Sequence, residues 1–355
     1  MVTIRDVAVR AGVGAGTVSR VLNGSPRVSP PTRERVAAAI EELGYRPNPL
    51  ARGLSRGRCQ TLGVIVPFFT HASAVERLRG VVAALDDSRY DLVLLNVESP
   101  IHRDEHFATL TRRDRADGLL VLSLPPRPAD IDRLTAAGVP VVLIDARAAG
   151  VPSVATDDAH GGRMATQLLV DLGHEHIAFI GEPPDNPLGF VSGTARQQGY
   201  AAVLAAAGLT EVIAHGRHDR RVAQHLTADL LQREPRPTAI FASSDVQAIG
   251  VLAGARAAGL RVPDALSVVG FDDIEISAYA GLTTVRQPLF ESGRLGTRLL
   301  LDALNGDGTS PADIRVHELP LELVERETTG PAPRRGRRNR QRPGRGGTEH
   351  DRKPE

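Results

Sequence analysis

Residues 3–23 read TIRDVAVRAGVGAGTVSRVLN, and this stretch predicts two short helices separated by a glycine turn. Thr3 is a favoured N-cap residue, and Gly12 follows the first apolar run, where helix ends often take a positive φ. Apolar side chains recur at three- or four-residue spacing, as one buried helix face requires; they are Ile4, Val7, Ala8 and Ala11, then Val18, Val21 and Leu22. Two helices joined in this way place the second one in the major groove of DNA.

A third helix is predicted to start at residues 29–32, Ser-Pro-Pro-Thr, because serine caps helices and proline is tolerated in their first turn. It ends at Gly44. Together, residues 3–54 resemble the DNA-binding headpiece of the LacI/GalR family of bacterial transcriptional regulators. The stretches LGHEHIAFIG, RQQGY, ALSVVGFDD and GLTTVRQP extend the resemblance to about residue 328. The resemblance implies a sequence-specific transcriptional repressor that responds to a small metabolite.

Charge is distributed unevenly along the chain. Residues 1–60 hold ten Arg and four acidic residues, a net charge of +6, and residues 331–355 hold eight Arg and one Lys against three acids, again +6. Because the whole chain carries +1, residues 61–330 carry −11. A basic head suits contact with phosphates, and an acidic body is repelled by them. The Arg-rich tail is either a dispensable solvated end or a source of sequence-independent DNA attraction.

Length and composition favour an α/β protein of two or three domains. The 355 residues include no Trp, and their single Cys excludes an internal disulfide and suits a reducing cytoplasm. The N-terminus is charged at Arg5 and Asp6, which is unlike a signal peptide, and no apolar run reaches the roughly 20 residues that span a bilayer. We therefore expect a cytoplasmic protein without membrane contact, and no cofactor or metal.

From Leu62 onward, short apolar runs alternate with helical stretches in two successive series. Each run is apolar throughout, which is typical of parallel strands covered by helices on both faces. The predicted strands are Leu62–Val66, Leu92–Val97, Gly118–Leu122 and Val141–Asp145, then Ile177–Gly181, Val212–His215, Ala239–Ser243 and Ser267–Gly270. Two such series predict two doubly wound parallel sheets. The domains are then an all-α helix-turn-helix headpiece (1–46), a hinge and linker (47–60), a two-lobed core like that of periplasmic binding proteins (61–330) and a disordered tail (331–355).

Ligands of doubly wound sheets bind at the carboxyl ends of the strands, so polar residues there are candidate effector contacts. The candidates in this position are Asp145, Arg196, Ser244, Asp245 and Asp272. Carboxylates around a guanidinium suit a polyhydroxylated ligand. The alternative for Asp145 and Asp245 is a simple N-cap of the next helix. For Arg196 and Asp272 the resemblance implies effector contact, because both match pocket positions of the family. We expect a sugar-like effector held between the two lobes.

One segment departs from the family pattern. Many relatives carry an Asn-Pro-Phe-Phe-like segment after the first strand, which supplies an aromatic pocket wall. Here residues 71–74 are His-Ala-Ser-Ala, whereas Phe68 and Phe69 come earlier. Ser73 can hydrogen-bond a ligand, but the stacking surface is smaller or displaced. The resemblance therefore does not name the sugar.

The exposed start of the second helix is the expected base-reading surface. The resemblance places base-choosing positions on Ala15 and Gly16, which offer little beyond contact with a thymine methyl group. Hydrogen-bonded readout then rests on Arg20, which can contact guanine bidentately. Phosphate contacts, which set register without reading sequence, are expected from Thr3, Thr17, Ser19, Asn23, Ser29 and Thr32. Gly14 and Gly16 weaken the helix, so we expect it to be less ordered away from DNA.

Residues 48–54, NPLARGL, resemble the family's hinge helix. In that role Leu54 of two subunits wedges into the minor groove at the centre of a pseudo-palindromic operator, which implies a homodimer. The separation of the first lobes then decides whether both headpieces dock, and a metabolite bound between the lobes changes that separation.

Other motifs favour no further chemistry. Residues 102–106, His-Arg-Asp-Glu-His, formally match a zinc-protease pattern but lack a third ligand, and residues 12–17 lack the strand and Lys of a phosphate-binding loop. Cys59 is interpreted as an inert thiol, with covalent coupling of two subunits as the alternative.

Three other classes of protein fit the sequence less well. A periplasmic binding protein would lack the headpiece. A sugar-modifying enzyme would need a set of catalytic residues, and the class of nucleoid proteins would not explain the acidic body.

Overall fold

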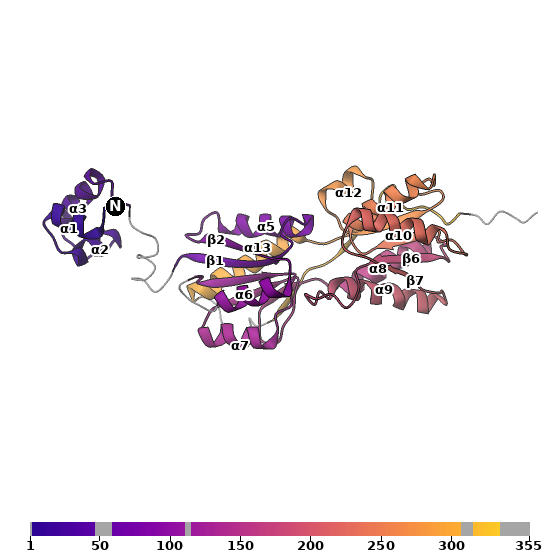
Figure 1. The fold of residues 1–355 in the computed structure, drawn as a ribbon, viewed down its shortest axis with the longest axis horizontal. Coiled ribbons are helices and arrows are strands. Elements are labelled where there is room, and N and C mark those ends of the chain that lie inside the picture. Colours follow the sequence, from indigo (N-terminus) through magenta and orange to yellow (C-terminus); the bar gives the residue numbers. More distant parts are fainter. Residues whose placement is uncertain (1, 47–58, 111–114, 307–314, 334–355) are drawn as a thin grey trace, which may run out of the picture. The chain divides into compact units, whose positions relative to one another are not determined.

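The computed structural model describes residues 2–46, 59–110, 115–306 and 315–333. The chain forms two compact units: the first comprises residues 1–157, 184–191 and 287–322, and the second comprises residues 158–183, 192–286 and 323–355. Residues 2–46 are called the headpiece, the rest of the first unit the first lobe, and the second unit the second lobe. Figure 1 shows them and labels their helices and some of their strands.

The headpiece consists of three helices around a small apolar core. They are α1 (Ile4–Ala11), α2 (Ala15–Leu22) and α3 (Pro30–Glu42). Val7, Val18 and Val36, one from each helix, have no exposed surface. The backbone N–H of Thr3 donates to the Asp6 carboxylate over 2.7 Å, and Gly12 takes a φ of 65° after α1. Both predicted helix boundaries are therefore confirmed.

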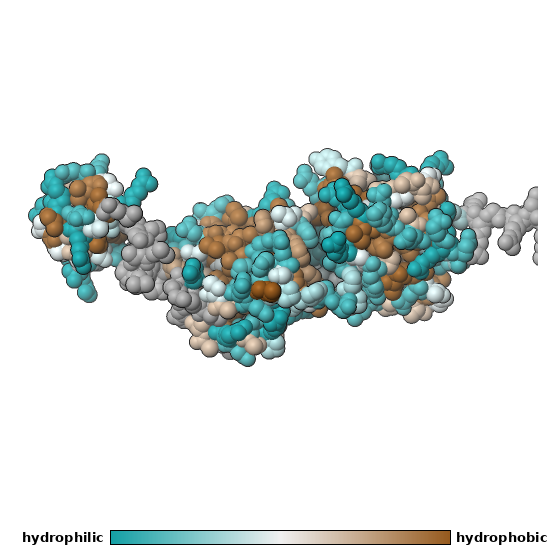
Figure 2. Space-filling view, viewed as in Figure 1, coloured by the Kyte–Doolittle hydropathy of each residue, from teal (hydrophilic) through white to brown (hydrophobic). Residues whose placement is uncertain are grey.

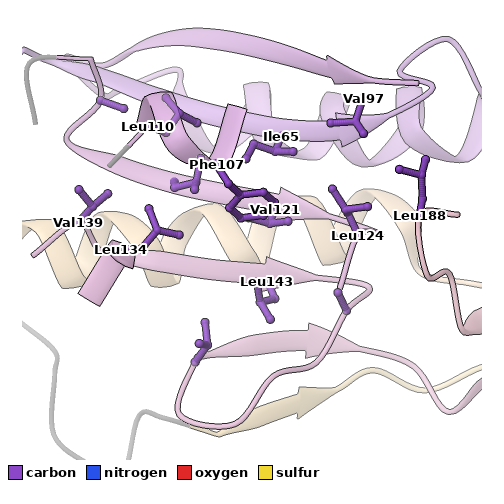
Figure 3. Packing of buried hydrophobic residues seen from close by; sticks show 14 residues of the cluster. Ile65, Val97, Phe107, Leu110, Val121, Leu124, Leu134, Val139, Leu143 and Leu188 are labelled. Carbon is purple, nitrogen blue, oxygen red and sulfur yellow. The ribbon is translucent and has the colours of Figure 1, made fainter. Parts of the chain in front are cut away.

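The first lobe is a six-stranded sheet with helices on both faces. Its strands are β1 (Thr61–Pro67), β2 (Asp91–Val97), β3 (Gly118–Leu122), β4 (Val141–Ile144), β5 (Ser153–Ala155) and β11 (Val316–Glu318), in the order β11-β5-β4-β3-β1-β2. Its helices are α5 (Ala72–Leu85), α6 (Pro100–Leu110), α7 (Pro128–Ala137) and α13 (Leu289–Asn305). Helices α5 and α13 approach closely at Gly80 and Gly293, where a Cβ atom would collide with the other helix's backbone. Figure 3 shows the apolar cluster that packs around Phe107 and Val121.

The second lobe repeats this architecture. Its strands are β6 (Ile177–Gly181), β7 (Val212–His215), β8 (Ala239–Ala242), β9 (Ser267–Asp272), β10 (Thr283–Arg286) and β12 (Glu322–Val324), in the order β12-β10-β9-β8-β6-β7. Its helices are α8 (Asp158–Asp171), α9 (Ser192–Ala207), α10 (Arg220–Leu231), α11 (Asp245–Ala257) and α12 (Glu275–Tyr279). Gly162 of α8 and Gly199 of α9 allow a close helix contact, because a Cβ atom on either would meet backbone atoms of the other helix.

The strand order locates the ligand-binding edge of each lobe. In the first lobe the order reverses between β1 and β3, and in the second between β6 and β8. Doubly wound sheets bind ligands at this switch point, beyond the carboxyl ends of the strands. The eight predicted strands and the fold class are confirmed. Four strands were not predicted, β5, β10, β11 and β12, because each has only three or four residues and no continuous apolar run.

Within the described residues, none of the helices combines the length and the apolar character needed to cross a bilayer. The predicted hinge, including Leu54, and most of the predicted tail lie outside the described residues.

Candidate DNA-binding surface and effector site

Helix α2 carries the expected base-reading residues on the headpiece surface. Val18 is the one fully buried residue of this helix, because it packs against α1 and α3. Gly16 and Arg20 are exposed, and Ala15 is half-exposed. The guanidinium of Arg20 makes no hydrogen bond or ion pair with the residues that the structure describes. Its donors are therefore available to a base edge.

Several of the expected phosphate-contacting side chains pair with one another. The Ser29 hydroxyl donates to Thr32 Oγ1 over 3.0 Å, which leaves the Thr32 hydroxyl proton as the donor for an incoming phosphate. Asn23 Nδ2 lies 3.5 Å from Ser19 Oγ. The Thr3 hydroxyl donates to Asp6 over 2.8 Å. Thr17 is half-exposed within α2.

Replacing Gly16 tests the predicted weakness of α2. A Cβ atom at Gly16 or Gly24 meets nothing within 4 Å, but Gly24 has a φ of 66°. We expect Gly16→Ala to stabilise α2 by up to about 1 kcal/mol. Gly24→Ala should destabilise the headpiece, because alanine is strained at positive φ. Amide hydrogen exchange of the full chain without DNA measures both. Unchanged exchange of α2 in Gly16→Ala would show that the glycine does not weaken the helix.

Backbone strain marks the carboxyl ends of the strands in both lobes. Phe68, Ser123 and Asp145 follow β1, β3 and β4 with φ angles of 44°, 49° and 59°. At β9 of the second lobe, Asp272 and Asp273 have φ angles of 115° and 56°. Such conformations cost on the order of 1 kcal/mol or more in non-glycine residues and gather at ligand sites. The backbone therefore points to the same two edges as the strand order does.

Asp145 is the centre of a polar cluster in the first lobe. Its Oδ2 atom lies 2.9 Å from Arg77 Nη2 and accepts a 2.8 Å hydrogen bond from Ser123. Arg77 also donates to Gln287 Oε1 over 3.2 Å, and a small cavity borders Arg77, Asp145 and Gln287. No helix begins at Asp145, so the N-cap alternative is excluded. Ser73, in the first turn of α5, is half-buried, and its hydroxyl makes no hydrogen bond with the described residues.

Arg196 is the centre of the second lobe's cluster. Its Nε atom donates to Asp158 over 2.8 Å, and its Nη1 atom donates to the Ser243 carbonyl over 2.7 Å. Asp272 Oδ1 lies 3.7 Å from Nη1, and the guanidinium stacks 3.7 Å from the centre of the Phe271 ring. These contacts fix the orientation of a cation that is only 6% exposed. The predicted proximity of Arg196 and Asp272 is observed.

Asp245 and Ser244 serve the local fold. Ser244 is the N-cap of α11, and its hydroxyl accepts the Gln247 amide over 3.2 Å. Asp245 has no exposed surface, and its carboxylate accepts from Ser277 and Thr284 at 2.6 Å each and from the Ile274 amide at 3.0 Å. We therefore correct the sequence expectation for Asp245 and assign it the role of holding the loop after β9, beside Asp272, rather than ligand contact.

Burial of Asp245 makes the stability of the folded chain depend on pH. Burial first, and the nearby Asp272 carboxylate second, raise the pKa of Asp245 to about 7, against the hydrogen bonds that favour its ionised form. A raised carboxyl pKa means that the folded state binds the proton more tightly than the unfolded state does. This contribution to stability is present below about pH 4 and is lost as the pH rises to about 7.

We expect Asp245→Asn to flatten that pH dependence. The variant cannot ionise and leaves one hydroxyl without its acceptor, so it should cost about 1–3 kcal/mol at pH 5 and less at pH 8. Urea unfolding of the full chain, followed by circular dichroism from pH 5 to 8, measures the difference from wild type. Asp264→Asn, at a carboxylate that is 61% exposed, is the control. If the difference in the free energy of unfolding between wild type and Asp245→Asn stays constant with pH, the raised pKa of Asp245 is contradicted.

Three site residues were missed by the sequence analysis. Arg77 shares the buried stripe of α5 with Ala74 and Val81, so a charged residue in an apolar helix face was the available signal. Asp158 contacts Arg196 from the start of α8, which no local pattern indicates. Glu182 follows β6 at the switch point of the second lobe. Burial raises the pKa of Glu182, and the Arg196 charge opposes that shift.

The rejected motifs have ordinary structural surroundings. His102 and His106 lie on α6, where His106 Nε2 is 3.0 Å from the Asn96 carbonyl, and no metal-binding cluster is found among the described residues. Cys59 lies against Asp117 with Sγ 3.4 Å from its carboxylate. Burial and this carboxylate raise the pKa of the Cys59 thiol, which disfavours the reactive thiolate.

Comparisons with known proteins agree with this architecture. Residues 3–48 match the family of bacterial regulatory proteins, lacI family, and residues 166–329 match the periplasmic binding protein-like domain. The HTH-type transcriptional regulator CelR of Thermobifida fusca is 40% identical over 346 residues, covering 92% of this chain and 98% of CelR.

Two solved structures are similar over nearly the whole chain. A complex of the transcriptional regulator CelR with cellobiose has a TM-score of 0.67 and 35% identity, covering 92% of this chain and 100% of that one. The lac repressor dimer bound to operator and the anti-inducer ONPF has a TM-score of 0.77 and 29% identity, covering 93% and 99%. With a headpiece and two lobes matched along almost their full length, the chain belongs to the LacI family of bacterial transcriptional regulators.

Proposed function

We propose that the chain is a homodimeric transcriptional repressor whose affinity for a specific operator is controlled by a sugar or sugar derivative. The observation that carries this proposal is the fixed cluster around Arg196 in a chain that also presents Arg20 on a recognition helix. The Arg196 cluster suits a polyhydroxylated ligand, and Arg20 on the recognition helix suits a base pair. Its relatives are regulators, and we assign it no catalytic role. It acts in the cytoplasm, where its DNA lies.

On the operator, Arg20 reads a guanine edge through paired donors. Ala15 and Gly16 allow the start of α2 to approach the bases closely. The hydroxyl and amide side chains already named contact phosphates on either side, and they fix the register. Leu54 of each subunit supplies the minor-groove wedge.

For the effector, each lobe contributes polar groups from its own strand ends. In the second lobe, the carboxylate of Asp272 accepts from sugar hydroxyls, and Arg196 donates to them. Ser244 supports this edge of the site from the start of α11. In the first lobe, Ser73 and Asp145 are the proposed contacts. Charge-assisted hydrogen bonds of this kind recognise hydroxyl groups with defined orientation.

The dimer requires a subunit contact, and the outer face of α5 and β2 suits one. Val75 and Val82 lie seven residues apart on the same side of α5, 43% and 52% exposed, and Val93 of β2 is 44% exposed. Figure 2 shows the brown, apolar area of the first lobe around these elements. Since β2 is the edge strand of its sheet, nothing in the described chain pairs with its outer side.

In vitro selection from a random DNA library tests the DNA-binding half of the proposal. We expect the selected sites to be pseudo-palindromic, with a guanine at equivalent positions of the two halves. Sedimentation of the purified chain should show a dimer at the concentration used. A monomer, or a selected pool without shared sequence, would contradict the proposal.

A further inference from the structure

Asp117 ties the residues that enter the first lobe to an interior strand of its sheet. It lies directly before β3, and its Oδ1 atom accepts the Cys59 amide over 2.9 Å while its Oδ2 atom accepts the Gln60 amide over 2.8 Å. The Cys59 thiol also lies 3.4 Å from Oδ1. One carboxylate therefore fixes two successive residues just before β1. We call Cys59, Gln60 and Asp117 the junction.

The carbonyl groups of the two entering residues are paired as well. The Thr61 hydroxyl donates to the Cys59 carbonyl over 3.3 Å, and the amide of Asp91, at the start of β2, donates to the Gln60 carbonyl over 2.9 Å. The Asp117 amide donates to the Thr61 carbonyl over 2.8 Å. Because every backbone donor and acceptor of Cys59 and Gln60 has a partner, the junction has little freedom to change its shape.

The backbone of Gln60 is strained. Its φ is 55°, in the left-handed region that residues other than glycine seldom take. Such a conformation persists only where the surrounding contacts impose it, and it gathers at functional sites. The φ of Gln60 sets the direction in which the preceding chain leaves β1. That chain is the predicted hinge, residues 47–58, so the contacts of Asp117 determine how the hinge starts.

Strand β3 connects the junction to the opposite edge of the sheet. Asp117 precedes β3 and Ser123 follows it, and the Ser123 hydroxyl donates to Asp145, a proposed effector contact, over 2.8 Å. All residues of β3 are buried, and the strand pairs with β1 on one side and β4 on the other. An extended stretch of this length spans about 20 Å. Since β3 is held on both sides, we expect it to move as a unit with its two ends.

We propose that Asp117 is a positioning residue for operator binding, because it transfers movement of β3 to the hinge through Cys59 and Gln60. Sugar bound beside Asp145 shifts one end of the strand, and the junction carries the shift to the residues that lead to the headpiece. Rigid strands and hydrogen-bond networks are able to carry such coupling. Asp117 contacts neither the sugar nor the DNA, so its loss removes the coupling and preserves both binding steps. This inference rests on the proposed control by a sugar.

Operator titrations of the full chain test the proposal. Cellobiose, glucose and ribose are tried first, to find a sugar that binds wild type. With that sugar at saturation, we expect the operator affinity of wild type to change at least about tenfold and that of Asp117→Ala about twofold or less. The variant should keep the wild-type affinities for the sugar alone and for a scrambled duplex. A merely structural role would lower the free energy of unfolding and preserve the tenfold response.

Asp91→Ala is the matched control. Asp91 is exposed at the same edge of the sheet, its carboxylate makes no hydrogen bond with the described residues, and the variant keeps the amide that contacts Gln60. Its sugar response should equal that of wild type. Gln60→Gly keeps the N–H and suits a φ of 55°, so it should respond as well.

Asp117→Asn is the second variant, for the case that Asp117→Ala does not fold. It keeps one acceptor oxygen and turns an N–H donor toward the other amide. Its sugar response should therefore lie between those of Asp117→Ala and wild type.

The single Cys of the chain reports whether the junction stays closed. Burial and the Asp117 carboxylate raise the pKa of the Cys59 thiol, so we expect Ellman's reagent to react slowly with wild type and several-fold faster with Asp117→Ala. In wild type the rate should not rise when the sugar is added, because the junction moves as a unit. The amides of Cys59 and Gln60 should exchange slowly with and without the sugar.

The outcomes distinguish the proposed function from the role of Asp117. If no sugar changes the operator affinity of wild type, control by a sugar is wrong and the role of Asp117 falls with it. If wild type responds and a folded Asp117 variant responds equally, the proposed function stands and the role of Asp117 is wrong. Loss of sugar binding in the variant, or a Cys59 rate that rises with sugar in wild type, would also overturn that role.

Discussion

Arg20→Ala is expected to abolish the preference for the selected operator while leaving weak, salt-dependent binding to any duplex. Arg20 is an exposed cation of α2 with no partner among the described residues, and the neighbouring Ala15 and Gly16 offer no hydrogen-bonding side chain. A bidentate contact to guanine contributes about 1–3 kcal/mol of discrimination, and a dimer on two half-sites loses it twice. Fluorescence anisotropy at fixed salt, with the operator and with a scrambled duplex, measures this loss.

Arg35→Ala is the matched control for Arg20→Ala. Arg35 is exposed on α3, so the variant removes the same charge from the same headpiece away from the recognition helix. It should preserve the ratio of operator to scrambled affinity. If Arg20→Ala weakens binding to both duplexes by the same factor, Arg20 contacts phosphate and the base-reading assignment is wrong.

Arg196→Ala is expected to eliminate the response to effector without removing operator binding. Arg196 supplies the cation of the second-lobe cluster, whereas the residues proposed to contact DNA lie in the headpiece. Its removal takes the shared cation away from Asp158 and Asp272, so we also expect a stability loss of about 3–5 kcal/mol. Operator titrations with and without the bound sugar measure the response.

Arg196→Lys separates ligand recognition from stability. Lysine keeps the charge near Asp158 but loses the planar guanidinium and its stacking on Phe271. The free energy of unfolding of Arg196→Lys should therefore be closer to that of wild type than that of Arg196→Ala is. Its affinity for the sugar should still be low. Arg256→Ala, on the exposed side of α11, should leave both properties unchanged. A normal sugar response in Arg196→Lys and Arg196→Ala would show that the effector is recognised elsewhere.

The elements with strong local patterns were predictable. The three headpiece helices follow from caps, glycines and apolar spacing, and the long strands follow from continuous apolar runs such as LGVIV at residues 62–66. The approach of Arg196 to Asp272 was predictable from the resemblance, because both match pocket positions. The short strands were not predictable, since three residues such as those of β11 carry no periodicity.

Residues whose role depends on distant partners were beyond local reasoning. Asp245 has the same local context as a helix cap or a ligand contact, and only the convergence of Ser277 and Thr284 shows that its oxygens are occupied. Residues 184–191 give no local signal either, because the packing of Leu188 in the apolar cluster of the first lobe depends on the tertiary fold. In both cases the deciding contact joins segments that are far apart in sequence.

We propose that sugar bound by the lobes changes how the headpieces of a dimer engage one specific operator. The most direct measurement is the affinity of wild type for its selected operator, by fluorescence anisotropy at fixed salt, with and without a saturating sugar. We predict a change of at least about tenfold, a coupling of roughly 1.4 kcal/mol, and no such change on a scrambled duplex. Equal affinity with and without the sugar, or equal affinity for operator and scrambled DNA, would contradict it.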